Sequence, residues 1–420
     1  MVRCLVGEQE LWRRVGAGLA VLRPLTSTPA SSATLLVDCT LVERRVARVR
    51  LSVHLLDGAV GRGATILSWL LAGLTREELE EQGLGGRGEQ GSRRGEEERW
   101  FRAWRSSLAE LGICPEDMVR VLAAVVLLQE VATEEVQDSN MALGNLAMVL
   151  GVNKEGLVAS LTTRQARVAG EVVRVEEGVG RAAACLGSSL YLRTVHTVVR
   201  RINRQEQVAV VGPMVSVLEV GQVEEEGRVQ GLHTLATLLL QDSLQHLYNT
   251  QALGGTVGHL VEESAAVVDL LSSPECGLLP LLVRAGGRSS ATPATYMGEV
   301  AEWQGHSSRL LRHPQHSLQF TVRHCGGLEV AYTATHFHSS SKGSVRGDLV
   351  TMFHPDSCTF PFLSHLYSSE LREGGEVHPL GPPRGRGGGV PCVARSLHQQ
   401  VLTSHQSPLG LFKKLKKVNF

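Results

Sequence analysis

The chain has 420 residues, of which 43% are hydrophobic, and its 42 lysines and arginines balance 42 aspartates and glutamates. A chain of this size can bury a substantial core and is expected to form two or three domain-sized units. Because the net charge is zero, composition gives no electrostatic support for a nucleic-acid partner, which favours a strongly basic surface. We therefore expect a globular protein that binds no nucleic acid.

Eight cysteines are spread along the chain without a Cys-x-x-Cys pair. Widely separated cysteines are typical of a reducing compartment, whereas small secreted scaffolds concentrate them. The N-terminal stretch has no continuous apolar run, and no window approaches the roughly 18 apolar residues that a membrane-spanning helix needs. The sequence predicts neither a signal peptide nor a transmembrane segment, and we expect a cytoplasmic protein.

The first periodic segments alternate with period two. They read TLLVDCTLV (residues 34–42) and RVRLSVHLL (residues 48–56), and in the second Val49, Leu51 and Val53 alternate with polar residues. Such alternation after a short charged link predicts a half-buried antiparallel strand pair.

From residue 100 the apolar period becomes helical. Met118 to Leu128 is almost entirely apolar, which predicts a buried helix. A second helix is indicated by an apolar stripe from which the arginines are largely excluded, formed by Leu186, Leu190, Val195, Val198 and Ile202.

Three further elements follow. The Val-rich stretch at residues 207–221 carries Gly212 and Pro213 in its middle and predicts a buried strand or strand pair. Leucines from Leu232 to Leu247 predict a helix of about five turns. The sequence LQFTVRHCGGLEVAY (residues 318–332) predicts a hairpin that turns at Cys-Gly-Gly.

One long segment resembles the myosin head. It reads LGVNKEGLVASLTTRQARVAGEVVRV (residues 150–175), followed by LYLRTVHTVVRRINR (residues 190–204). In myosins a helix and a Leu-Thr-Thr-Arg element precede a short strand pair, and a long helix then ends in an Asn-Arg-Ile-Asn type sequence. The corresponding positions here are Leu161 to Arg164 and Arg201 to Asn203.

Other blocks resemble myosin heads in the same chain order, over roughly residues 25 to 370. They are LLAGLTREEL from Leu70, FRAWRSSLAELGICPEDMVRVLAAVVLL from Phe101, LLLQDSLQHLYN from Leu238, FTVRHCGGLEVAYTATHF from Phe320 and GDLVTMFHPDSCTFPFLSHLYS from Gly347. Its degenerate nucleotide switches, described below, resemble most closely those of the class XVIII unconventional myosins. The resemblance implies an α/β fold, a partial myosin-type head of the P-loop NTPase class.

Three stretches rich in Gly, Pro, Ser or charge, starting at Leu84, Gly286 and Leu371, indicate surface loops. With the resemblance, they divide the chain into five parts. These are an N-terminal remnant with a switch I-like strand pair (1–83), a linker (84–99), a helical upper subdomain (100–212), a switch II-like strand with the lower subdomain (213–370), and a flexible loop with a basic tail (371–420).

The phosphate-binding loop of this NTPase class is absent from the chain. That loop places a glycine directly before its lysine. The six lysines here follow Asn153, Ser341, Phe412, Lys413, Leu415 and Lys416. The family uses ATP and Mg²⁺, but we expect neither to be bound by this chain, because the loop that binds the β- and γ-phosphates is missing.

The two nucleotide switches are degenerate. Switch I of myosins carries Ser-Ser-Arg, and the aligned positions hold Ser31, Ser32 and Ala33, so the arginine that pairs with switch II is missing. Switch II maps onto Glu219 and Gly221, with a longer acid and a shortened spacing. The alternative is that the serines form a polar turn before a strand and that Glu219 ends one.

The resemblance also implies an actin-facing surface, on a helix-loop-helix at about residues 346–367 and a flexible loop at about 368–395. The candidate contacts are Asp356, Phe360, Pro361 and Phe362 at an exposed tip, with Arg384 and Arg386 in the loop. The alternatives are that Phe362 belongs to ordinary core helices and that the two arginines lie in a solvated linker.

Other site chemistries find less support. Histidines are dense from His306 to His354, but no HExxH or Cys-x-x-Cys motif accompanies them, and we expect no metal site. The nucleophile-elbow pattern G-x-S-x-G of hydrolases is absent.

The sequence therefore predicts a non-catalytic actin-binding or scaffolding head, a cytoskeletal pseudoenzyme whose partner is the actin filament. We expect dimerisation only through a tail that these 420 residues do not include. The alternative is an ATP-dependent actin motor whose phosphate loop and lever lie outside the chain. A third possibility is a truncated product without a stable fold, since central strands without neighbours leave open sheet edges.

Overall fold

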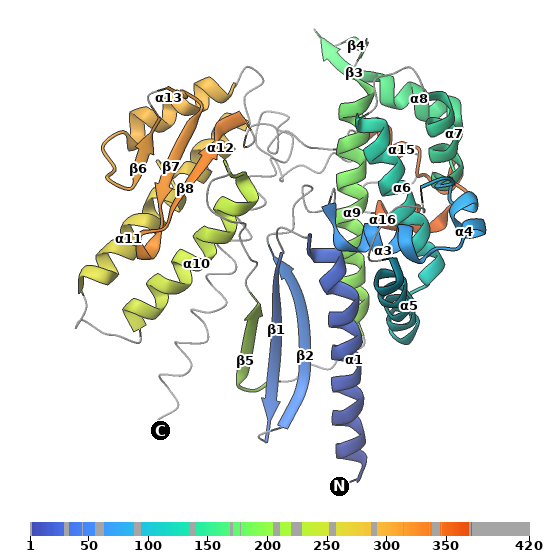
Figure 1. The fold of residues 1–420 in the computed structure, drawn as a ribbon, viewed down its shortest axis with the longest axis horizontal. Coiled ribbons are helices and arrows are strands. Elements are labelled where there is room, and N and C mark those ends of the chain that lie inside the picture. Colours follow the sequence, from blue (N-terminus) through green and yellow to red (C-terminus); the bar gives the residue numbers. More distant parts are fainter. Residues whose placement is uncertain are drawn as a thin grey trace. The chain divides into compact units, whose positions relative to one another are not determined.

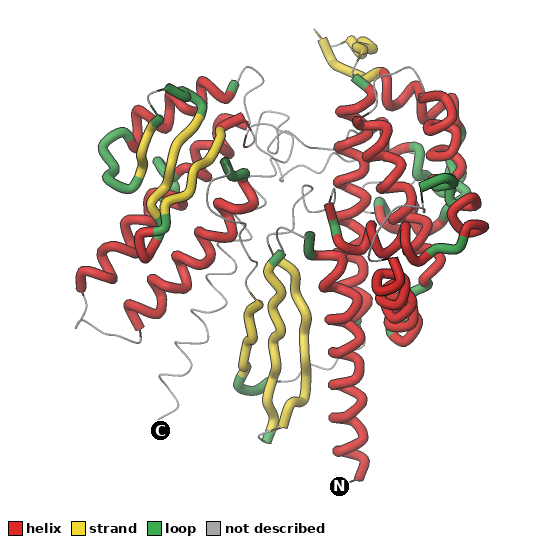
Figure 2. The backbone as a smooth tube through the Cα atoms, in the orientation of Figure 1, coloured by secondary structure: helices red, strands yellow, loops and turns green. Residues whose placement is uncertain are grey.

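The structure is a computed structural model, shown in Figure 1. It describes residues 2–28, 33–43, 45–54, 63–87, 94–133, 139–168, 171–176, 178–204, 211–219, 229–251, 258–286, 292–313, 315–335, 337, 345, 347–368 and 371. The fold is mixed α/β, and Figure 2 shows helices in most of the described chain, with strands in three small antiparallel sheets.

The chain forms two compact units, and each is assembled from separate stretches of sequence. Unit 1 contains residues 1–29, 58–208 and 344–385, and unit 2 contains residues 30–57, 209–343 and 386–420. The linear division expected from composition did not anticipate this arrangement, because loop-like composition marks local breaks and not which distant segments pack together.

Unit 1 is largely helical. Its elements are α1 (Val2–Thr26), α3 (Thr65–Gly73), α4 (Arg76–Glu81), α5 (Arg94–Glu110), α6 (Pro115–Thr133), α7 (Ser139–Leu150), α8 (Lys154–Thr162), β3 (Thr163–Val168), β4 (Glu171–Glu176), α9 (Val179–Asn203), α15 (Gly347–Thr351) and α16 (Pro361–Leu366). Strands β3 and β4 form an antiparallel pair. The N-terminal helix α1 was not predicted from the sequence.

Helix α6 lies at the centre of unit 1 and packs against α3, α5, α7 and α9. The predicted buried helix is confirmed, since the residues from Met118 to Leu128 are buried with the exception of Arg120. The apolar stripe of α9 is also confirmed and faces this core. The two helices approach closely at Gly187, where a Cβ would lie 3.3 Å from the Cβ of Leu128.

Two buried polar groups attach α1 to the rest of unit 1. The Tyr191 hydroxyl donates a hydrogen bond to the carbonyl of Leu25, and the indole Nε1 of Trp104 donates to the carbonyl of Val21 at 3.2 Å. Burial raises the pKa of Tyr191 far above its usual range, so the phenol remains a donor.

The linker expected at residues 84–99 is shorter in the structure. Leu84 is fully buried, and its backbone N–H donates to the carbonyl of Leu79 at 2.7 Å. Helix α5 already begins at Arg94, within the charged run that suggested a loop. Charge alone was misleading here because one face of a surface helix is charged as well.

Unit 2 contains a three-stranded sheet and a helical part with a second sheet. Its elements are β1 (Thr34–Val42), β2 (Arg45–His54), β5 (Met214–Glu219), α10 (Leu232–Gln251), α11 (Gly258–Ser272), α12 (Leu278–Gly286), α13 (Pro293–Gln304), β6 (Leu310–Arg312), β7 (Gln319–Arg323), the 3₁₀ turn η3 (Cys325–Gly327) and β8 (Glu329–Thr333). Strand orders are β2-β1-β5 and β6-β7-β8, all antiparallel.

The predicted strand pair at β1 and β2 is confirmed, and Val49, Leu51 and Val53 are buried. The strand predicted within 207–221 is β5, but its expected burial is wrong. Val215 and Val217 are 48% and 59% exposed, and β5 lies at an edge of the sheet among the described strands. An apolar run does not distinguish a central strand from an edge strand.

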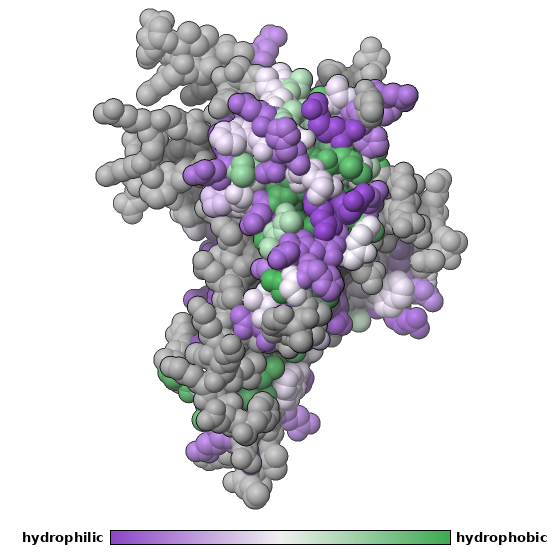
Figure 3. Space-filling model, turned by 90° about the vertical axis from the view of Figure 1, so that its left-hand side faces the viewer, coloured by the Kyte–Doolittle hydropathy of each residue, from purple (hydrophilic) through white to green (hydrophobic). Residues whose placement is uncertain are grey.

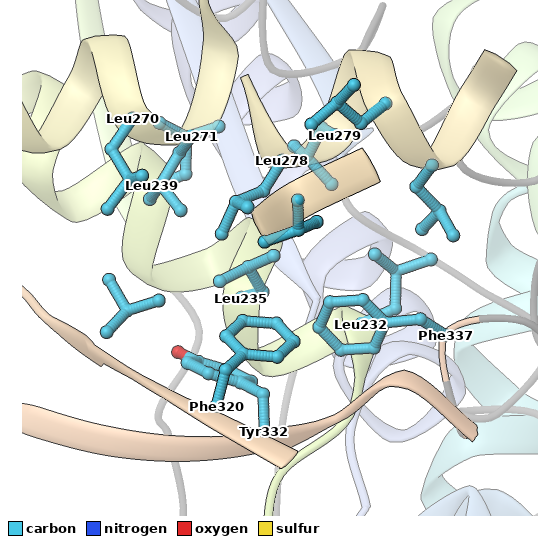
Figure 4. Close-up of a cluster of buried hydrophobic side chains, with 14 of the residues drawn as sticks. Leu232, Leu235, Leu239, Leu270, Leu271, Leu278, Leu279, Phe320, Tyr332 and Phe337 are labelled. Atoms are coloured by element: carbon cyan, nitrogen blue, oxygen red, sulfur yellow. The ribbon is translucent and has the colours of Figure 1, made fainter. Parts of the chain in front are cut away.

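The helical part of unit 2 encloses one hydrophobic cluster, shown in Figure 4. Leu232, Leu235 and Leu239 of α10 contribute to it, and Phe320 and Tyr332 enter from β7 and β8. The two aromatic residues face each other across the predicted hairpin, which is confirmed. Gly326 and Gly327 adopt φ values of 70° and 81°, so the turn needs glycine.

The surface of the described residues is mostly polar where Figure 3 shows it, with hydrophobic side chains in smaller areas between hydrophilic ones. Within the described parts of the chain, no helix is both long enough and apolar enough to cross a membrane.

A buried polar network joins α10 to the hairpin. Asp242 accepts a hydrogen bond from the backbone N–H of Cys325 at 2.9 Å, and its other oxygen lies 2.7 Å from Nδ1 of His324. Nε2 of His324 lies 2.9 Å from the Tyr332 hydroxyl. Burial and the Asp242 carboxylate raise the pKa of Tyr332, so its phenol stays protonated and donates to Nε2 of His324. Nδ1–H of His324 then donates to the Asp242 carboxylate.

We expect Asp242→Ala to lower the unfolding free energy of unit 2 by about 3 kcal/mol. The substitution removes the acceptor of two buried donors, each worth roughly 1–3 kcal/mol when left unsatisfied. Hydrogen exchange of the slowest amides in β7 and β8 measures the change. Asp269→Ala, at an exposed position of α11, is the control and leaves exchange unchanged. Equal exchange in both variants would contradict a stabilising role for the network.

Candidate functional site

The segment that carries the resemblance has the expected order of elements. Helix α8 is followed by the β3–β4 pair and then by the 25-residue helix α9, which ends at Asn203. The two threonines stand at the end of α8, where Thr162 Oγ1 donates to the carbonyl of Val158 at 2.9 Å and Thr163 Oγ1 to that of Ala159 at 2.8 Å. The Ala159 carbonyl also accepts from the Thr163 backbone N–H, so the two hydroxyls add second hydrogen bonds to carbonyls at the end of the helix.

Of the four candidate nucleotide-binding residues, Glu219 lies in the described part of the chain. Ser31, Ser32 and Gly221 lie outside the described residues. Glu219 is the last residue of β5 and is exposed, so the expectation that it ends a strand is confirmed. Ala33, at the position of the switch I arginine, is buried directly before β1.

An exposed carboxylate at the end of an edge strand is a poor phosphate-binding group, because like charges repel and no lysine of the Gly-Lys type is present in the sequence. Among the residues that the structure describes, no group of three metal-ligating side chains lies close enough together to hold an ion. His336 and His338, in the histidine-dense region, lie outside those residues.

The candidate actin-facing segment contains two short helices, α15 and α16, joined by residues 352–360. The side chain of Asp356 is 87% exposed, Pro361 is exposed, and Phe362 is half-buried. The expectation that Phe360 also lies at the exposed tip is wrong, since it is only 2% exposed. Arg384 and Arg386 lie outside the described residues.

Phe360 is buried because it has a partner that the sequence did not reveal. The guanidinium carbon of Arg120, from α6, lies 4.2 Å from the centroid of the Phe360 ring. This distance is typical of a cation–π contact, which favours arginine over lysine when the planar group stacks on a ring. Phe360 therefore anchors the loop, while Phe362 remains available at the surface.

The second helix of the segment is attached to α9. Arg193 donates to the carbonyl of Leu366 at 2.9 Å, and its guanidinium lies 4.4 Å from the centroid of the Tyr367 ring. Tyr367 also stacks on Phe353 at 5.1 Å, and its hydroxyl donates to Ser189 Oγ at 3.0 Å. Leu363 and Leu366 of α16 are buried, so this helix packs against unit 1 while the tip of the segment stays exposed.

Sequence reasoning missed Arg120 and Arg193 as supports of this segment. Both sit on helices whose periodicity was recognised, but an arginine beside an apolar stripe is normally a solvated residue. Their partners lie far along the chain, as for Arg193 and Leu366, which are 173 residues apart. No local pattern in the sequence could have indicated these contacts.

Comparison with known proteins does not assign the chain to a group. No protein family matches the sequence, and a search of curated proteins finds no relative.

We expect the chain to bind no Mg-ATP with a dissociation constant tighter than roughly 1 mM, an affinity of about −4 kcal/mol. The reason is that the sequence lacks the glycine-lysine phosphate loop and the switch I arginine. Isothermal titration calorimetry with and without Mg²⁺ measures this. A magnesium-dependent dissociation constant in the micromolar range would contradict it, and Glu219→Gln would then test whether that carboxylate takes part.

Proposed function

We propose that this chain is part of a diverged myosin-type head that acts as a non-catalytic actin-binding module or scaffold in the cytoskeleton of the cytoplasm. The observation that carries the proposal is the segment formed by α15, its loop and α16. Its buried residues pack against unit 1, and Asp356, Pro361 and part of Phe362 are exposed to solvent.

The order of elements supports the family part of the proposal. A helix, a short strand pair and a long helix follow one another where the resemblance implies them. The hairpin at β7 and β8 and the helix-loop-helix then follow in the same order as in myosin heads. An order of several elements is more specific than one local motif, because unrelated short matches would not preserve it.

The chemistry of the switches supports binding without catalysis. Phosphoryl transfer on this fold depends on positioning and on charges around the phosphates, so loss of the lysine loop removes its main component. Ala33 cannot supply the positive charge of the switch I arginine. A head that has lost these groups acts through its surface alone.

The exposed tip by itself is small compared with a stable interface, which buries about 800 Å² on each partner. A filament contact would therefore extend beyond α16 to neighbouring surface. Met148 of α7 is a candidate, because it is 52% exposed and its carbonyl accepts a hydrogen bond from Arg120, which also contacts Phe360. Arg384 and Arg386, which follow in the sequence outside the described residues, would add positive charge toward acidic residues of actin.

The test is co-sedimentation of the full chain with filamentous actin, with and without ATP. We expect the chain to pellet with filaments and the pelleted fraction to be unchanged by ATP, because nothing couples nucleotide to the surface. Release by ATP would instead favour the motor alternative. A chain that stays in the supernatant at all filament concentrations, while melting cooperatively in circular dichroism, would refute the proposal.

We further expect Phe362→Ala to weaken filament binding by about 5- to 30-fold, the range that corresponds to losing roughly 1–2 kcal/mol at an aromatic contact. The matched control is Trp303→Ala, which removes an aromatic residue that is 50% exposed in unit 2. Equal weakening by the two substitutions would show that Phe362 makes no specific contact.

A further inference from the structure

The loop of the candidate actin-facing segment is attached to the C-terminal end of α7. The backbone N–H of Thr359 donates to the carbonyl of Gly151 at 2.8 Å, and the Cys358 thiol donates to that of Leu150 at 3.4 Å. Burial raises the pKa of the Cys358 thiol, so it stays protonated as a donor. The loop and the helix end therefore form one hydrogen-bonded joint.

The side chain of Arg120 contacts both the end of α7 and the loop. Nε of Arg120 donates to the carbonyl of Val149 at 2.7 Å, and its Nη2 donates to that of Met148 at 3.2 Å. These carbonyls belong to the last turn of α7, where helix carbonyls have no partner within the helix. The same guanidinium stacks on the Phe360 ring at 4.2 Å.

The fit at the joint is tight. Gly151 has φ of +70°, and a Cβ there would lie 2.6 Å from Thr359 Oγ1 and 3.0 Å from the Phe360 backbone nitrogen. Both the backbone conformation and the close approach of the loop require glycine. The position of the loop is thus set by the end of α7 and by the residue that holds that end.

We propose that Arg120 is the positioning residue of the filament-binding surface, because it links the buried helix α6, the end of α7 and the Phe360 anchor of the loop. The inference rests on the proposed function. A lysine would keep the charge, but it lacks the planar fork that donates to two carbonyls while stacking on a ring. Arg120→Lys should therefore release the loop without removing the charge.

The experiment uses the full chain with Arg120→Lys, with Phe360→Leu, and with the double substitution. Arg102→Lys is the matched control, since Arg102 is an exposed arginine of α5 paired with Glu98.

Hydrogen exchange of the Thr359 amide reports the position of the loop, and actin co-sedimentation reports binding. We expect faster exchange and about tenfold weaker binding for Arg120→Lys, with the thermal melt retained. The double variant should bind no more weakly than either single variant, because the two residues act as one contact.

The outcomes separate this inference from the proposed function. If the unsubstituted chain does not bind actin, the proposed function fails, and the exchange of the Thr359 amide alone decides whether Arg120 holds the loop. Unchanged exchange in Arg120→Lys would overturn the inference. Faster exchange with unchanged actin affinity would overturn it as well, because the loop would then lie outside the binding surface. Losses that add fully in the double variant would also refute a shared contact.

Discussion

Unit 1 depends on the burial of one helix. Helix α6 is apolar around its circumference over Met118 to Leu128, so it requires cover on several sides, and α3, α5, α7 and α9 provide it. Each fully buried leucine or valine of such a helix contributes roughly 1.5–3 kcal/mol. Arg120 interrupts the apolar run and is half-buried. Burial of α6 against its neighbours therefore also places the guanidinium of Arg120 at the end of α7.

The candidate binding surface derives from this core and not from its own short helices. Helix α16 has six residues and could not be stable alone. It is stabilised by burial of its own Leu363 and Leu366 and by the contacts of Tyr367 with α9. A surface that is fixed in this way loses little conformational entropy on binding, which favours affinity for a rigid partner such as a filament.

Unit 2 contains a buried polar network in addition to its hydrophobic cluster. Its polar groups Asp242, His324 and Tyr332 are buried and hydrogen-bonded to one another, which stabilises the contact between α10 and the hairpin. Glu219, the described residue of the degenerate switches, is exposed at the end of an edge strand.

Periodicity in the sequence by itself determined the helices α6, α9 and α10, the β1–β2 pair and the hairpin at β7 and β8. The residues that precede the six lysines likewise determined that these 420 residues contain no Gly-Lys phosphate loop, because that motif is local. The exposure of Val215 and Val217, the burial of Phe360 and the two discontinuous units were decided only by the tertiary structure. Periodicity reports which face of an element is apolar, whereas edge position and the pairing of Phe360 with Arg120 depend on segments that are distant in the chain.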